Sequence, residues 1–182
     1  MHFVESRPGV IRSISQRWLL NHWIRIRADK VLPAWQGLEA EELLRMTENL
    51  TFSDVVGDKD SVRFLIRYHG EKIAEMYGSN CRGKFLDEIL PPALLKPALD
   101  TYRQVLAARR PVYTVVDTSD RNARPVHYER LLLPFGRDTE TVDRVLASLE
   151  TVSPDGAFEN RDLMKLPALK AKFGICAVIS QA

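Results

Sequence analysis

The residues best suited to chemistry in this 182-residue sequence are two cysteines and four histidines. Cys81 and Cys176 lie far apart and form neither a CxxC pair nor a metal-ligand pattern. No ligand spacing joins the histidines, which are His2, His22, His69 and His127. GxSxG, HExxH, Walker and GxGxxG motifs are also missing from the sequence. We therefore expect no catalysis and no metal site, and we expect His69 and His127 to be hydrogen-bonded structural residues.

Composition favours an ordinary globular protein. Hydrophobic residues make up 45% and charged residues 27% of the chain, and no apolar run is long enough to span a membrane. With two isolated cysteines, a reducing compartment is expected, and we predict the cytoplasm. The net charge of +2 argues against nucleic acid as the partner, although residues 1–30 are basic and residues 39–60 acidic. Solvated faces are the simplest explanation of these two blocks, and a contact within or between chains is the alternative.

The elements that must position any site begin with a predicted hairpin near the middle of the chain. In residues 128–135, Leu131, Leu133 and Phe135 share one face of a strand, while Tyr128, Arg130 and Leu132 share the other. A polar GRDTET turn follows, and residues 142–149 also alternate as a strand would. A helix over 142–149 satisfies the pattern too, but the first strand needs a partner for its backbone groups, so we favour the hairpin.

Other segments give clear signals on either side of that hairpin. We predict helices over 14–28, 38–46, 71–77, 84–90 and 92–109, a second hairpin over 50–56 and 62–68, and a strand over 111–119. In the second hairpin, Phe64 and Ile66 should point inward and Arg63 and Arg67 outward. Residues 153–182 suggest a helix broken by Pro167 and then a short apolar strand, or a tail docked on a neighbour.

We divide the chain into three segments. Residues 1–48 form an N-terminal helical segment, residues 49–152 the main domain, and residues 153–182 a C-terminal extension. The expected class is α+β.

The order of these elements resembles that of PAS domains, and of a bacterial single-domain PAS-like family in particular. Three stretches carry the likeness: WLLNHWIRIRADKVLPAW, FLIRYHGEKIAEMYGSNCRGKFLDEILP, and YERLLLPF with its partner VDRVLASL. The resemblance covers about residues 14–152. It implies a five-stranded antiparallel sheet with helices on one face, and a sensory or regulatory role. One departure is GLEAEEL, where relatives carry an Asp-Pro step.

In a PAS domain, a pocket between the sheet and the helices can hold a small molecule. The resemblance places nine residues where they can reach it: Phe64, Ile66, Tyr77, Phe85, Leu99, Tyr102, Tyr128, Arg130 and Leu132. Core packing is the simpler role for the apolar ones. Arg130 is the most informative, because a guanidinium buried under the helices needs an anion, either Asp or Glu or a bound carboxylate or phosphate. On the opposite face it would be solvated.

No cofactor signature is evident. The string GSNCRGKFL is similar to the GxNCRFL motif of flavin photosensors, whose cysteine bonds the flavin. Cys81, however, precedes Gly83, the glycine that best matches the anchor of the next helix, whereas the photosensor cysteine follows that glycine. The apolar helix faces also offer no axial histidine for haem. We therefore expect neither group.

Two functions remain open. In the first, the chain senses a small molecule and passes a change of shape to a separate regulatory protein. In the second, it is a ligand-free docking domain that forms a homodimer, or binds another regulator, through Trp18, Trp23 and Ile26. Binding of nucleic acid by the basic first 30 residues is a weaker third reading.

Overall fold

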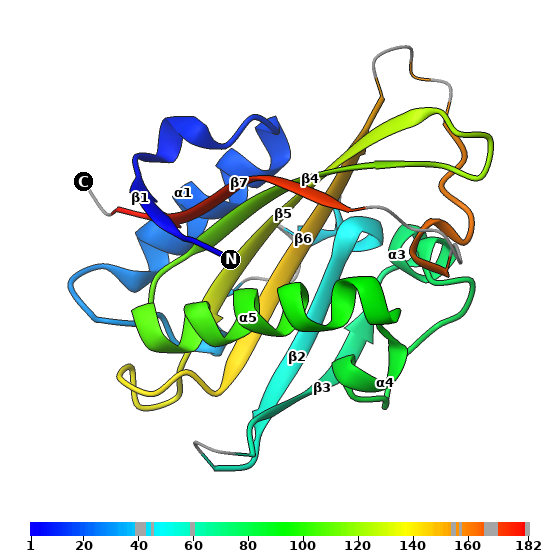
Figure 1. Ribbon diagram of the computed structural model, residues 1–182. Coiled ribbons are helices and arrows are strands. Elements are labelled where there is room, and N and C mark those ends of the chain that lie inside the picture. Colours follow the sequence, from blue (N-terminus) through cyan, green and yellow to red (C-terminus); the bar gives the residue numbers. More distant parts are fainter. Residues whose placement is uncertain are drawn as a thin grey trace.

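A single seven-stranded β-sheet forms the centre of the molecule (Figure 1). The structure is a computed structural model that describes residues 1–38, 43–44, 46–58, 61–153, 156, 158–165 and 171–180. The strands lie in the order β1-β7-β4-β5-β6-β2-β3. Their bounds are β1 Val4–Ser6, β2 Leu50–Val56, β3 Arg63–His69, β4 Val112–Ser119, β5 Pro125–Phe135, β6 Arg144–Val152 and β7 Lys172–Ile179.

Helices cover both faces of this sheet. In Figure 1, α5 lies in front of the sheet and α1 behind it. The α-helices are α1 Ile14–Arg27, α3 Glu71–Met76, α4 Leu86–Ile89 and α5 Pro92–Ala108. The described residues also form short 3-10 helices, η1 Pro8–Val10, η2 Trp35–Gly37, η3 Thr47–Asn49 and η4 Leu163–Lys165. None of the described helices is long and apolar enough to cross a membrane.

Strand β5 lies between β4 and β6 and shows why both faces of the sheet must be covered by helices. Its residues from Tyr128 to Phe135 are all buried, so both of its faces are inside the protein. On one face, Arg130 donates a hydrogen bond to Thr101 of α5. On the other, the Glu129 carboxylate accepts one from the backbone N–H of Ser13, which caps α1. The alternation predicted for this strand is confirmed, and so is the hairpin it makes with β6.

The sequence predicts an α+β fold, and this class is confirmed. Strands β2 to β6 supply the five antiparallel strands of the prediction. Two more extend the sheet, because β7 pairs antiparallel with β4 and β1 pairs parallel with β7. The apolar strand suggested near the C-terminus is therefore present. Helices α3, α4 and α5 lie on one face as predicted, and α1, the N-terminal helix predicted apart from them, covers the other face (Figure 1). The helices predicted over 38–46 and before and after Pro167 fall largely outside the described residues.

The hairpin of β2 and β3 also has the predicted inward face. Phe64 and Ile66 are buried, whereas Arg63 and Arg67 are partly exposed and form ion pairs with Asp87 and Asp54. These ion pairs lie on the outer surface of the hairpin. Its inward face lines the interior beneath the helices.

Candidate ligand-binding site

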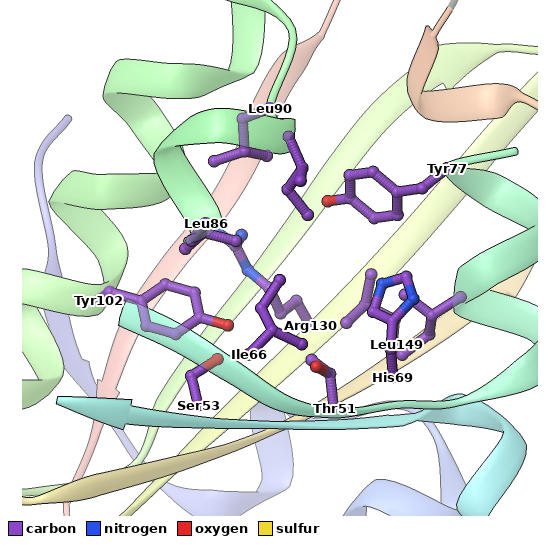
Figure 2. A pocket seen from close by; sticks show the side chains of 12 residues that line it. Thr51, Ser53, Ile66, His69, Tyr77, Leu86, Leu90, Tyr102, Arg130 and Leu149 are labelled. Atoms are coloured by element: carbon purple, nitrogen blue, oxygen red, sulfur yellow. The ribbon is translucent and has the colours of Figure 1, made fainter. Parts of the chain in front are cut away.

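A small cavity lies between the sheet and the three helices α3, α4 and α5 (Figure 2). Its volume is about 30 Å³, enough for one or two water molecules. The residues that line it are Thr51, Ser53, Ile66, His69, Ile73, Tyr77, Leu86, Ile89, Leu90, Tyr102, Arg130 and Leu149.

A second cavity of about 10 Å³ adjoins the first and shares four of its lining residues, Tyr77, Leu90, Arg130 and Leu149. It extends toward the C-terminal part of the chain, which contributes Met164 of η4 and Phe173 of β7. Together the two spaces are far smaller than the roughly 300–1,000 Å³ of a pocket for a drug-sized ligand. A guest of that size requires the covering helices to move.

Among the described residues, Arg130 is the only cation in the lining of either cavity. Its side chain is buried, with 8% of the residue exposed. Nη2 donates a hydrogen bond to Thr101 Oγ1 at 2.9 Å, whereas the buried Nε–H has no partner. Within the described part of the chain, no carboxylate forms an ion pair with this guanidinium. As far as the described residues go, a positive charge is therefore held inside the protein without a counter-charge, an arrangement that costs stability.

Three tyrosines surround this guanidinium. Figure 2 shows the hydroxyls of Tyr77 and Tyr102 pointing inward from opposite sides, with Arg130 between them. Burial raises the pKa of Tyr77 and Tyr102, and it raises the pKa of Tyr128 to about 12. The charge of Arg130 acts in the opposite direction on all three but is outweighed. The phenols consequently stay neutral near pH 7 and keep their O–H groups as donors.

His69 adds a fourth polar group from the end of β3. Burial lowers the pKa of His69 to about 4, so the imidazole is neutral at pH 7. Nδ1 accepts a hydrogen bond from the backbone N–H of Cys81 at 3.3 Å. The proton of the neutral ring must therefore sit on Nε2, which makes that atom a donor. The imidazole also packs edge-on against Tyr77, with ring centroids 5.5 Å apart.

Five of the nine residues predicted to reach the pocket line one of the two cavities. Ile66, Tyr77, Tyr102 and Arg130 line the larger, and Tyr128 lines the smaller together with Tyr77 and Arg130. The other four line neither and belong to the surrounding packing, which corrects the prediction for Phe64, Phe85, Leu99 and Leu132. Phe64, for example, packs on the ring of Tyr102, with centroids 4.7 Å apart.

Sequence reasoning missed more than half of the lining. Thr51 and Ser53 lie on β2 and Leu149 on β6, and the alternation of those strands carried the signal that places them. Leu86 and Ile89 come from the short helix α4, and Met164 from η4, where no periodic pattern marks the inward side.

The predicted interface residues on α1 separate into exposed and buried. Trp18 is 38% exposed and stacks on His22, with ring centroids 5.3 Å apart. Ile14, one turn earlier, is 83% exposed. Trp23 is fully buried, and its Nε1–H donates to the Pro134 carbonyl at 2.7 Å. The prediction that Trp23 faces a partner is therefore wrong, because this ring packs on the sheet of its own chain.

Ile26 is partly buried against the same core. The outward side of α1 is consequently narrower than the sequence suggested, and Ile14 and Trp18 are its exposed apolar residues.

The family of the chain follows from its sequence as a whole. A protein-family model described as PAS domain matches residues 11–150. The chain belongs to the PAS domain family. The match spans α1, strands β2 to β6 and the helices over the cavity. The resemblance noted in the sequence is confirmed.

Solved structures with a similar fold include several light-oxygen-voltage (LOV) domains. One comes from a study of a flavin analogue in such a domain. It is 16% identical to this chain, with a TM-score of 0.44, and the alignment covers 63% of this chain and 84% of the LOV chain. The Rhodobacter sphaeroides LOV protein is 16% identical, with a TM-score of 0.44 and coverages of 65% and 71%. The dark structure of the blue-light photoreceptor Aureochrome1 LOV is 13% identical, with a TM-score of 0.41 and coverages of 63% and 83%. No curated protein matches the chain.

The residues of this PAS domain do not fit a flavin. The two cavities, of about 30 and 10 Å³, leave no room for its three fused rings. Cys81 lines neither cavity, and its buried thiol donates to the Ser79 carbonyl instead. Among the described residues, no cluster of three or more His, Cys, Asp or Glu side chains is suited to a metal ion.

Proposed function

We propose that this PAS domain is a sensory module that binds a small molecule between the sheet and helices α3 to α5. It has no catalysis of its own and passes a change of shape to a separate regulatory protein. The observation that carries the proposal is Arg130, a buried guanidinium that points into the cavity with one N–H unpartnered. A charge retained in this way at a cost to stability indicates a functional rather than a structural role.

The fold offers a route from the cavity to the opposite face of the sheet. Arg130 and Glu129 are neighbours on β5 and point to opposite faces. The Glu129 carboxylate accepts hydrogen bonds from the Tyr113 hydroxyl at 2.7 Å and from the Ser13 N–H at 3.2 Å. A shift of β5 caused by a ligand on Arg130 therefore alters the support of the N-terminus of α1. Such a ligand acts only as far as it prefers one of the two arrangements.

A thermal-shift screen of the purified chain with small metabolites tests this function. A ligand at about 100 times its Kd adds about 2.7 kcal/mol to the free energy of unfolding. For a chain of this size, that raises Tm by about 5–10 °C. The proposal predicts such a rise for the wild type and its loss in Arg130→Met. The matched control is Arg67→Met, an exposed arginine on the edge strand β3. No response to any compound would refute the proposal.

A second candidate is a ligand-free docking domain, favoured by the small cavities and by the exposed Ile14 and Trp18. We propose a second copy of the chain as the occupant, because two such helices can pack against each other about a two-fold axis. Light scattering on the wild type and on Trp18→Ala should then show a dimer that the substitution weakens. A monomer in both would remove this candidate.

The cellular setting we propose is the cytoplasm. What supports it is that Cys81 and Cys176 are both free thiols, as expected in a reducing compartment. Fractionation of cells that express the tagged chain tests this assignment.

A further inference from the structure

We infer that the ligand of this cavity is a small monocarboxylate with a short apolar body, whose carboxylate binds Arg130. The inference rests on the proposed sensory function and names the class of molecule that is sensed. Three independent properties of the lining lead to it: its charge, the direction of its hydrogen bonds, and its size.

The charge of the lining is positive and uncompensated. Arg130 contributes one cation, and no Asp or Glu of the described part of the chain lines either cavity. An anion gains a charge-assisted hydrogen bond with the free Nε–H and at the same time relieves an unpaired buried charge. A single guanidinium balances one negative charge. A phosphate monoester carries about −1.5 to −2 at pH 7, so part of its charge would remain buried without a counter-ion.

The hydrogen-bonding groups around Arg130 are also those that suit a carboxylate. Tyr77 and Tyr102 are kept protonated by burial, and His69 presents its Nε2–H because Nδ1 is already an acceptor. A carboxylate is an acceptor on both oxygens and can use several such donors at once. An ammonium group offers only donors and would meet the charge of Arg130 without a carboxylate to balance it. Amines are therefore excluded by the same lining.

The size and polarity of the remaining wall set the body of the ligand. Beyond the polar groups, the larger cavity is lined by aliphatic side chains, which are Ile66, Ile73, Leu86, Ile89, Leu90 and Leu149. About 30 Å³ is available before any side chain moves, with about 10 Å³ more beyond Arg130. This space holds one or two water molecules, so even a body of a few carbons requires α4 or α5 to move away from the sheet, and each further methylene requires a larger displacement. Helix α4 has only four residues, which makes it the easier of the two to displace.

The test compares probes of equal shape and different charge. Acetate, propionate and butyrate are titrated into the full chain at pH 7 and constant ionic strength, beside propionamide, propylamine and inorganic phosphate. Binding is followed by calorimetry and by amide chemical shifts. Propionate is expected to bind at least tenfold more tightly than propionamide, and to shift amides of β5 and α5. Propylamine is expected not to bind. Phosphate is expected to bind more weakly than propionate, because its second charge has no partner.

Variants then assign the binding to Arg130. Arg130→Met should weaken propionate by about 30-fold or more, since it removes one partner of a buried charge pair. Arg130→Lys should retain part of the affinity, because the charge stays while the forked geometry is lost. Arg67→Met should bind as the wild type does. Near-ultraviolet circular dichroism confirms that each variant is folded.

The outcomes separate the inference from the function on which it rests. If propionamide or propylamine binds as well as propionate, or if Arg130→Met binds propionate normally, the inference is overturned while the sensory function stands. Preference for phosphate also overturns it. If none of these probes and no compound of the wider screen binds, the sensory function itself is refuted together with the inference.

Discussion

The substitution Arg130→Met tests whether the buried guanidinium serves ligand binding or the stability of the fold. Methionine has similar length and removes both the buried charge and the Nε–H that has no partner. The hydrogen bond to Thr101 Oγ1 is lost as well, but the Thr101 hydroxyl keeps its own bond to the Pro97 carbonyl at 2.8 Å. Thr101 Oγ1 loses the donor it had in Arg130, but the hydroxyl stays hydrogen-bonded through the Pro97 carbonyl, which keeps its own donor. We expect the ligand-free Arg130→Met protein to be more stable than the wild type.

The magnitude follows from the two opposing effects. A buried polar group without a partner costs about 1–3 kcal/mol, and the lost hydrogen bond from a charged donor contributed about 1.5 kcal/mol. Replacing buried charged groups by apolar side chains of similar volume has been neutral or stabilising by up to about 4 kcal/mol in other proteins. A net gain of about 1 kcal/mol is the central expectation. For a chain of 182 residues this raises Tm by about 2–4 °C.

Urea unfolding followed by tryptophan fluorescence, with calorimetry for Tm, measures this difference on dialysed protein. Arg67→Met serves as the control, because its guanidinium is largely exposed and pairs with Asp54 at 2.6 Å. It should lose less than about 1 kcal/mol. If Arg130→Met instead loses about 3 kcal/mol or more, the guanidinium has a structural counter-charge. The argument for a ligand at Arg130 would then fail.

Three further outcomes are expected. Trp23→Ala should lower the free energy of unfolding by about 3–5 kcal/mol, because it removes a fully buried ring. Trp18→Ala should change it by less than about 1 kcal/mol, because the Trp18 ring is partly exposed. Equal losses for the two variants in urea titrations would contradict this difference. His69 binds its proton less readily in the folded state, so its contribution to the free energy of unfolding is fully present above pH 6.5 and is lost as the pH falls from 6.5 toward about 4. This loss should be smaller in His69→Asn, whose amide oxygen can accept a hydrogen bond from the Cys81 N–H. When the protein is mixed with flavin mononucleotide and passed over an ultrafiltration membrane that retains the protein, the flavin should pass into the filtrate. Retained protein that stays yellow and is bleached by blue light would contradict the conclusion that a flavin does not fit the cavity.

The sheet and the inward side of its strands were predictable because they depend on local alternation. In β5, Leu131 and Arg130 had to face opposite ways whatever covered them, and the structure places them so. Arg130 was recognisable as the informative residue for the same reason. A charged residue at a position whose neighbours two residues away are apolar is unusual in a buried strand.

The covers of the sheet were harder to predict, because they depend on contacts between distant parts of the chain. Helical spacing shows that Trp23 lies on an apolar stripe, but not whether that stripe meets the same chain or another. The bond from Trp23 to Pro134 joins residues 111 positions apart. Strand β1 has only three residues and no alternation of its own, and it exists because β7 offers a free edge. Met164 reaches the second cavity by a route that no periodic pattern marks.

The pairing of β7 with β4 has a practical consequence for anyone who trims the chain. A truncation to residues 11–150, the span that matches the family, removes β1 and β7 and uncovers the backbone of β4 along Val112–Asp117. An uncovered row of N–H and C=O groups on a strand rich in valine recruits strands from other molecules. The trimmed protein would self-associate through this artificial edge. Its apparent oligomeric state would then say nothing about α1.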